Sequence, residues 1–111
     1  TATHDGTAIA TATLEHVAER LRCPSLFVTH YPELSAAADR LAAAGRSAAN
    51  AHMAYLDAEQ AGSASVVLLY RVQAGAAGRS YGLDVARMAG LPARLLDTAA
   101  AFAGAMRRCV V

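Results

Sequence analysis

His30 is the residue of this sequence best placed to do chemistry, because it follows the apolar run of residues 25–29, Ser-Leu-Phe-Val-Thr. Such a run is typical of a strand covered on both faces, and in open α/β sheets ligands bind outside the carboxyl ends of the strands. Imidazole changes charge near physiological pH, so a histidine there could polarise, donate to or sense a phosphate oxygen. A histidine that only caps the loop after the strand fits the position equally well.

His4 is a second, weaker candidate. It precedes Asp5 and Gly6, and we expect it in a loop that enters a helix, where free backbone amides can meet a phosphate. Thr3 and Asp5 are candidate N-caps for that helix, and Asp5 also complements the positive end of the helix dipole.

Other kinds of site receive less support. His30 and His52 could approach each other on neighbouring strands, but no cysteine or carboxylate stands at recognised metal-ligand spacing. Cys23 and Cys109 lie far apart, which predicts neither a zinc site nor a disulfide framework and favours a reducing compartment. No serine lies in a G-x-S-x-G elbow, so a nucleophilic triad is disfavoured.

A complete nucleotide site cannot close within this chain. All ten basic residues are arginine, and a P-loop needs its phosphate-reaching lysine. The glycines at 75, 78 and 82 match neither P-loop nor dinucleotide-binding spacing, and we interpret them as a tight strand-to-helix turn. The net charge of +1 provides no basic field for nucleic acid or membrane binding, and no apolar stretch reaches about 18 residues.

The elements that position these residues follow an α/β pattern. The 111-residue chain is 55% apolar but only 5% aromatic, which predicts a thin core rich in alanine. We expect a helix over residues 5–22, the strand 25–29 and a helix over 33–44 that ends at Gly45, with Leu34, Ala38 and Leu41 inside. Two antiparallel strands, 50–57 and 65–72, follow around the polar loop 59–63. A helix over 80–89, a break at 90–92 and a last helix with Pro92 near its start make a helix-turn-helix.

Five blocks along the chain, in order, resemble the C-terminal ATPase domain of MutS-type DNA mismatch repair proteins. They are residues 1–6 (TATHDG), 26–34 (LFVTHYPEL), 50–53 (NAHM), 75–86 (GAAGRSYGLDVA) and 89–92 (AGLP). The resemblance covers nearly the whole chain, and the residues in these blocks look most like those of the eukaryotic MutS homologue 3 branch.

The resemblance implies a fragment of an ABC-type (P-loop NTPase) domain, with a parallel strand, an edge hairpin and a C-terminal helix-turn-helix. Two such chains pair to build composite sites for ATP and Mg2+, whose P-loop and acidic strand lie upstream of the segment seen here. His30 would match the switch histidine near the γ-phosphate. The loop of residues 1–6 would approach the partner's nucleotide through Thr1, Thr3, His4 and Asp5, although Ala2 stands where the family usually has serine.

The same resemblance implies ATP-dependent mismatch recognition and initiation of repair by the intact protein. Residues 1–74 would belong to the ATPase domain and residues 75–111 to a dimerisation arm. The partner would be another MutS-family subunit, mismatched DNA would bind through other regions, and the protein would be nuclear in a eukaryote and otherwise cytoplasmic. A non-catalytic dimerisation module and a fragment of another ABC-type ATPase are the alternatives.

Overall fold

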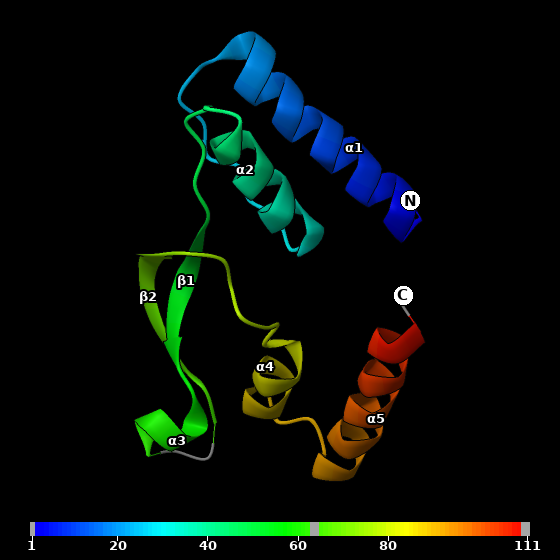
Figure 1. Cartoon of the computed structure of the whole chain (residues 1–111). Coiled ribbons are helices and arrows are strands. Elements are labelled where there is room, and N and C mark those ends of the chain that lie inside the picture. Colours follow the sequence, from blue (N-terminus) through cyan, green and yellow to red (C-terminus); the bar gives the residue numbers. More distant parts are fainter. Residues whose placement is uncertain (1, 63–64, 110–111) are drawn as a thin grey trace. The chain divides into compact units, whose positions relative to one another are not determined.

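A computed structural model of the chain describes residues 2–62 and 65–109 as helices joined to a two-stranded sheet (Figure 1). The chain divides into two compact units. Unit 1 comprises residues 1–52 and 72–77, and unit 2 comprises residues 53–71 and 78–111. The boundary passes through the hairpin, so that the base of the hairpin belongs to unit 1 and its tip to unit 2.

Unit 1 begins with α1, Thr3–His16, which continues through a π-helical turn over Val17–Leu21. The predicted helix is confirmed, but its predicted caps are wrong. Ala2 is the N-cap and makes no side-chain capping bond, because its methyl group carries no acceptor. The first turn begins with a backbone bond from Gly6 N–H to the Ala2 carbonyl, 2.9 Å long. Thr3 and Asp5 therefore lie inside the first turn, and only the favourable position of the Asp5 carboxylate near the helix dipole is retained.

The predicted strand over residues 25–29 is absent, and the expectation of a parallel strand there is wrong for this structure. A strand needs a neighbour to satisfy its backbone groups. Among the described residues only β1 and β2 form a sheet, so the run remains unpaired, with Leu26 98% exposed and Val28 95% exposed. His30 therefore lies in a connection between two helices and not at a strand end.

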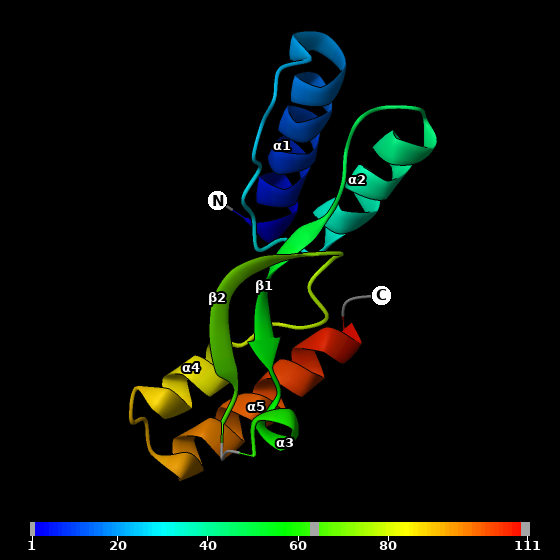
Figure 2. The ribbon, with the colours of Figure 1, turned by 90° about the vertical axis from the view of Figure 1, so that its left-hand side faces the viewer.

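α2, Glu33–Ala43, lies beside α1 in both ribbon views (Figure 1, Figure 2). Its inner face confirms the predicted core positions, since Leu34, Ala38 and Leu41 are buried together with Ala37. The helix ends as predicted at Gly45. That residue has φ +84°, and Arg46 N–H donates to the Leu41 carbonyl at 2.9 Å, which is the bond of a Schellman motif.

The predicted antiparallel pair is confirmed as β1, Ala51–Leu56, and β2, Val67–Ala74. The predicted loop over 59–63 is partly wrong, because α3, Ala58–Ala61, occupies most of it. Asp57 caps this short helix in a capping box, in which its backbone N–H donates to Gln60 Oε1 at 3.2 Å. Ser63, the last residue of that loop, lies outside the described residues.

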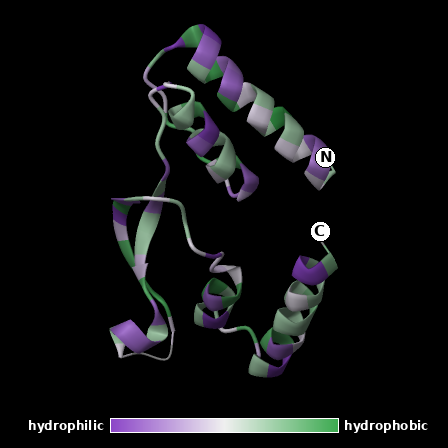
Figure 3. Ribbon diagram, viewed as in Figure 1, coloured by the Kyte–Doolittle hydropathy of each residue, from purple (hydrophilic) through white to green (hydrophobic). Residues whose placement is uncertain are grey.

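Unit 2 contains the predicted helix-turn-helix, formed by α4, Gly82–Met88, and α5, Ala93–Cys109. α4 ends at Gly90, φ +90°, where Leu91 N–H donates to the Ala86 carbonyl at 3.1 Å. Apolar residues recur along α5 (Figure 3), but only Leu96 is buried, at 3% exposure, while Phe102 is 63% exposed. Within the described ranges no helix has the length and apolar character needed to cross a membrane.

Candidate functional site

Two segments with candidate nucleotide-contacting residues meet inside unit 1, at Gly6 and Tyr31. The Tyr31 hydroxyl oxygen lies 2.6 Å from the place where a β-carbon on Gly6 would stand. Only a glycine lets the tyrosine approach α1 this closely. The contact therefore places the first turn of α1, with Thr3, His4 and Asp5, next to the connection that carries His30.

The His30 ring is exposed and lies beside the Tyr31 ring, with 5.0 Å between the ring centroids and a tilt of 38°. The backbone around it is held by local hydrogen bonds. Tyr31 N–H donates to Thr29 Oγ1 at 3.0 Å, and the Tyr31 carbonyl accepts from Leu34 N–H at 3.2 Å. The histidine thus presents an accessible imidazole from a connection that is anchored to the start of α2.

Three of the remaining predicted nucleotide-binding residues lie in a helix and not in a loop. Thr3, His4 and Asp5 are exposed residues of the first turn of α1, which corrects the expectation that His4 lies in a loop. Thr1 lies outside the described residues. The change follows from the backbone bond at Ala2, which starts the helix two residues earlier than the sequence pattern predicted.

The structure places His52 against the turn after β2. His52 Nδ1 lies 2.8 Å from the Gly75 carbonyl oxygen, and because a carbonyl can only accept, Nδ1 carries the proton. The turn interpretation of the glycines is confirmed at Gly75, whose φ of +99° is the left-handed conformation that favours glycine. No group of three His, Cys, Asp or Glu side chains gathers to hold a metal ion among residues 2–62 and 65–109.

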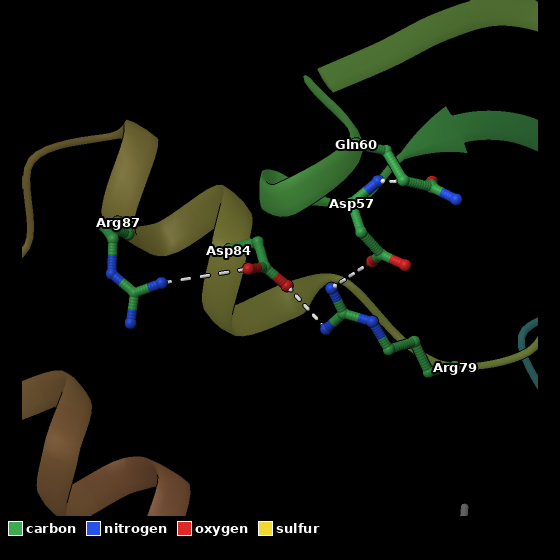
Figure 4. Close-up of polar contacts among 5 residues, drawn as sticks. All are labelled: Asp57, Gln60, Arg79, Asp84 and Arg87. Atoms are coloured by element: carbon green, nitrogen blue, oxygen red, sulfur yellow. Dashed lines mark hydrogen bonds and ion pairs between the residues drawn. The ribbon is translucent and has the colours of Figure 1, made fainter. Parts of the chain in front are cut away.

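Sequence reasoning missed a polar cluster in unit 2, centred on Arg79 (Figure 4). The guanidinium bridges Asp57, at 3.1 Å, and Asp84, at 3.0 Å, while Arg87 reaches the other Asp84 oxygen at 3.8 Å. Arg79 thereby ties the end of β1 to α4. No local periodicity signals this cluster, because Asp57 lies 22 residues before Arg79 and only the fold brings them together.

Two tyrosines support the same corner of unit 2. The Tyr55 and Tyr81 ring centroids are 4.4 Å apart with a tilt of 53°, and Arg79 lies over the Tyr81 ring at 5.3 Å. Burial of the hydroxyl raises the pKa of Tyr81 to about 12, and the neighbouring Tyr55 hydroxyl adds to the rise. A β-carbon on Gly78 would lie 3.5 Å from the Tyr55 hydroxyl oxygen, so the turn that leads into α4 packs closely on β1.

Comparison with known proteins defines the class to which this chain belongs. The family model described as MutS domain V matches residues 1–107, and the chain is a member of the MutS family. The resemblance of the five sequence blocks is thereby confirmed.

Two kinds of relative lie at similar identity. The DNA mismatch repair protein MutS of Cereibacter sphaeroides is 48% identical over 99 residues, covering 89% of this chain and 10% of that protein. The DNA mismatch repair protein MSH3 of Chaetomium globosum is 46% identical over 112 residues, covering 90% of this chain and 10% of that protein. The DNA mismatch repair protein msh3 of Aspergillus niger is 42% identical over 99 residues, covering 89% of this chain and 9% of that protein. The chain therefore spans about a tenth of the length of the curated relatives that it matches, which include the MSH3 branch beside bacterial MutS.

Proposed function

We propose that this chain is part of the ATPase domain of a MutS-type mismatch repair protein and that it supplies a switch histidine, a nucleotide-facing turn and dimerisation helices. The contact between Gly6 and Tyr31 carries the proposal. It joins the two segments that the family resemblance assigns to ATP, although they are about 25 residues apart in sequence.

His30 would orient the attacking water or sense the γ-phosphate. Phosphoryl transfer depends mainly on positioning and charge stabilisation, and an exposed imidazole on an anchored backbone suits that role. Thr3, His4 and Asp5, together with Thr1, would face the nucleotide of the partner subunit. The triphosphate and Mg2+ would be held by an upstream P-loop within an ABC-type fold, since the chain itself has no lysine.

The helix-turn-helix in residues 75–111 would form the dimerisation arm. α5 exposes Leu95, Phe102 and Met106 at 49%, 63% and 67%, and apolar side chains in this number on one helix suit packing against another subunit. The partner would be a second MutS-family subunit. Mismatched DNA would bind elsewhere in the protein, because the net charge of +1 leaves this segment without a basic surface.

Equilibrium binding and turnover test this proposal together. The full-length protein should hydrolyse Mg-ATP, whereas the isolated 111-residue chain should show no micromolar Mg-ATP affinity. Tight binding by the isolated chain would contradict a site completed by other regions. A full-length protein that dimerises but hydrolyses no ATP would instead identify a non-catalytic dimerisation module.

A further inference from the structure

The side chain of Asn50 joins the base of the hairpin to α2. Its Nδ2 lies 3.0 Å from the Ser35 carbonyl oxygen and 3.0 Å from Asp39 Oδ1. A carbonyl and a carboxylate are both acceptors, so the amide must present its NH2 group to them and donates both hydrogen bonds. Asn50 is half-buried, and all three residues belong to unit 1.

The backbone of Asn50 is held from the other strand. Its carbonyl accepts from Gly75 N–H at 2.9 Å, and the Gly75 carbonyl accepts from His52 Nδ1 at 2.8 Å. Gly75 has φ +99°, so this exchange of hydrogen bonds depends on a glycine at the end of β2. Asn50 is thus fixed to the hairpin by its backbone and to α2 by its side chain.

The point of attachment on α2 is the turn that follows His30. Ser35 lies in the first turn of the helix, and its own N–H donates to the Pro32 carbonyl at 3.1 Å. The preceding bond runs from Leu34 N–H to the Tyr31 carbonyl at 3.2 Å. The side-chain bond from Asn50 to Ser35 and the backbone bonds of this first turn therefore connect the Asn50 amide to Tyr31, the residue adjoining His30.

We propose that Asn50 is a positioning residue for His30, and this inference rests on the proposed function. The Asn50 amide holds the first turn of α2 at a fixed place on the hairpin, and that turn sets where the His30 backbone enters the nucleotide site. Asn50 does not touch the imidazole. Its loss misplaces His30 without removing any group that binds ATP.

Turnover by the full-length protein separates this role from a general contribution to stability. In Asn50→Asp, a carboxylate replaces the donor amide and faces the Asp39 carboxylate and the Ser35 carbonyl. Misplacement of a catalytic group by about 1 Å can cost about 100-fold, so kcat should fall by about tenfold or more. The KM for ATP should stay within about twofold, because the lost interaction is not one that binds the ground state.

A second variant allows the proposal to be tested even if Asn50→Asp folds poorly. The double variant Asn50→Asp with Asp39→Asn restores a donor and an acceptor between residues 50 and 39 but leaves a carboxylate facing the Ser35 carbonyl, so kcat should recover only in part, to a value between that of Asn50→Asp and that of wild type. Glu15→Gln, which removes one charge from an exposed residue of α1 as Asp39→Asn does from α2, should leave turnover unchanged. A double variant with the full wild-type kcat overturns the proposal, because the bond to Ser35 would then not be needed, and so does an equal loss through KM.

The inference and the proposed function can fail separately. If His30→Ala abolishes turnover while Asn50→Asp leaves it unchanged, Asn50 does not position His30 and the proposed function stands. If the wild-type protein hydrolyses no ATP, the proposed function fails. The NMR signals of the His30 imidazole then decide the inference: they should move in Asn50→Asp and return only in part in the double variant, and unchanged signals overturn it.

Discussion

Tyr31 and Gly6 approach so closely that a β-carbon on Gly6 would lie 2.6 Å from the Tyr31 hydroxyl oxygen and 3.3 Å from the ring carbon that bears it. Gly6 lies inside α1, where glycine is an unfavourable choice for the helix. The cost to the helix is offset by a contact that joins α1 to the connection carrying His30.

Replacing this glycine therefore tests the contact. Gly6→Ala should lower the free energy of unfolding by about 1–3 kcal/mol, because the methyl group overpacks against the tyrosine. Gly104→Ala is the matched control within α5, where the new methyl group meets only the end of Arg108 at 3.5 Å, and it should stabilise by about 0.5–1 kcal/mol. Urea unfolding measures both. Tyr31→Phe should recover much of the loss in Gly6→Ala, and the absence of any recovery would argue against this contact.

His30→Ala should lower kcat for ATP hydrolysis by the full-length protein by about 10- to 100-fold, since a group that orients water or stabilises charge is lost. Mismatch affinity should change far less, because DNA is bound by other regions. The control is His16→Ala, which removes an exposed imidazole at the end of α1. Steady-state turnover beside mismatch titration checks this, and turnover equal to wild type would end the switch assignment.

Arg79→Ala should lower the free energy of unfolding only modestly, because it removes an exposed guanidinium whose ion pairs to Asp57 and Asp84 are weakened by solvent. About 1 M NaCl should shrink the difference, since salt screens exposed ion pairs. Arg94→Ala, on the surface of α5, should change stability less. Chemical unfolding at low and high salt makes the comparison, and equal effects of the two variants would show that the bridge contributes nothing.

Tyr81 should make stability depend on pH in the alkaline range. The unfolded chain loses the phenolic proton near pH 10.0, whereas burial keeps it on the folded chain up to about pH 12. Between these two values the unfolded state binds fewer protons than the folded state. The contribution of Tyr81 to the free energy of unfolding is therefore fully present below pH 10.0 and is lost as the pH rises toward about 12. In Tyr81→Phe the free energy of unfolding should decrease less over the same range of pH. Ultraviolet difference titration follows the ionisation, and a wild-type curve that matches that of the variant plus one ordinary tyrosine would refute it.

Phe102→Glu should weaken self-association or pairing through α5, because it replaces an apolar side chain that is 63% exposed on the proposed pairing face with a charged one. Leu96→Ala should act differently and lower stability by about 2–5 kcal/mol, since Leu96 is buried at 3% exposure. Sedimentation of the full-length protein, with circular dichroism of each variant, separates the two effects. Pairing unaffected by Phe102→Glu would remove this face from the proposed dimer.

Local patterns in the sequence determined the hairpin and the helices α1, α2, α4 and α5, but not the short helix α3. Glycine at the left-handed positions 45 and 90 ended α2 and α4 where expected, because the signal for such an end lies within a few neighbouring residues. The buried positions of α2, Leu34, Ala38 and Leu41, followed from helical spacing in the same way. The five blocks that resemble MutS-type proteins could also be identified from the sequence, because each is a contiguous run of residues.

Only the tertiary structure decided which of these pieces meet. The apolar run 25–29 has the composition of a buried strand, but strand formation depends on a neighbour that composition cannot supply, and the run remains exposed. The approach of Tyr31 to Gly6, the link from Asn50 to Ser35 and the bridge from Arg79 to Asp57 each join residues 15 to 25 positions apart, as their numbers show. No local period encodes such pairs, because they depend on how helices and hairpin pack after each has formed.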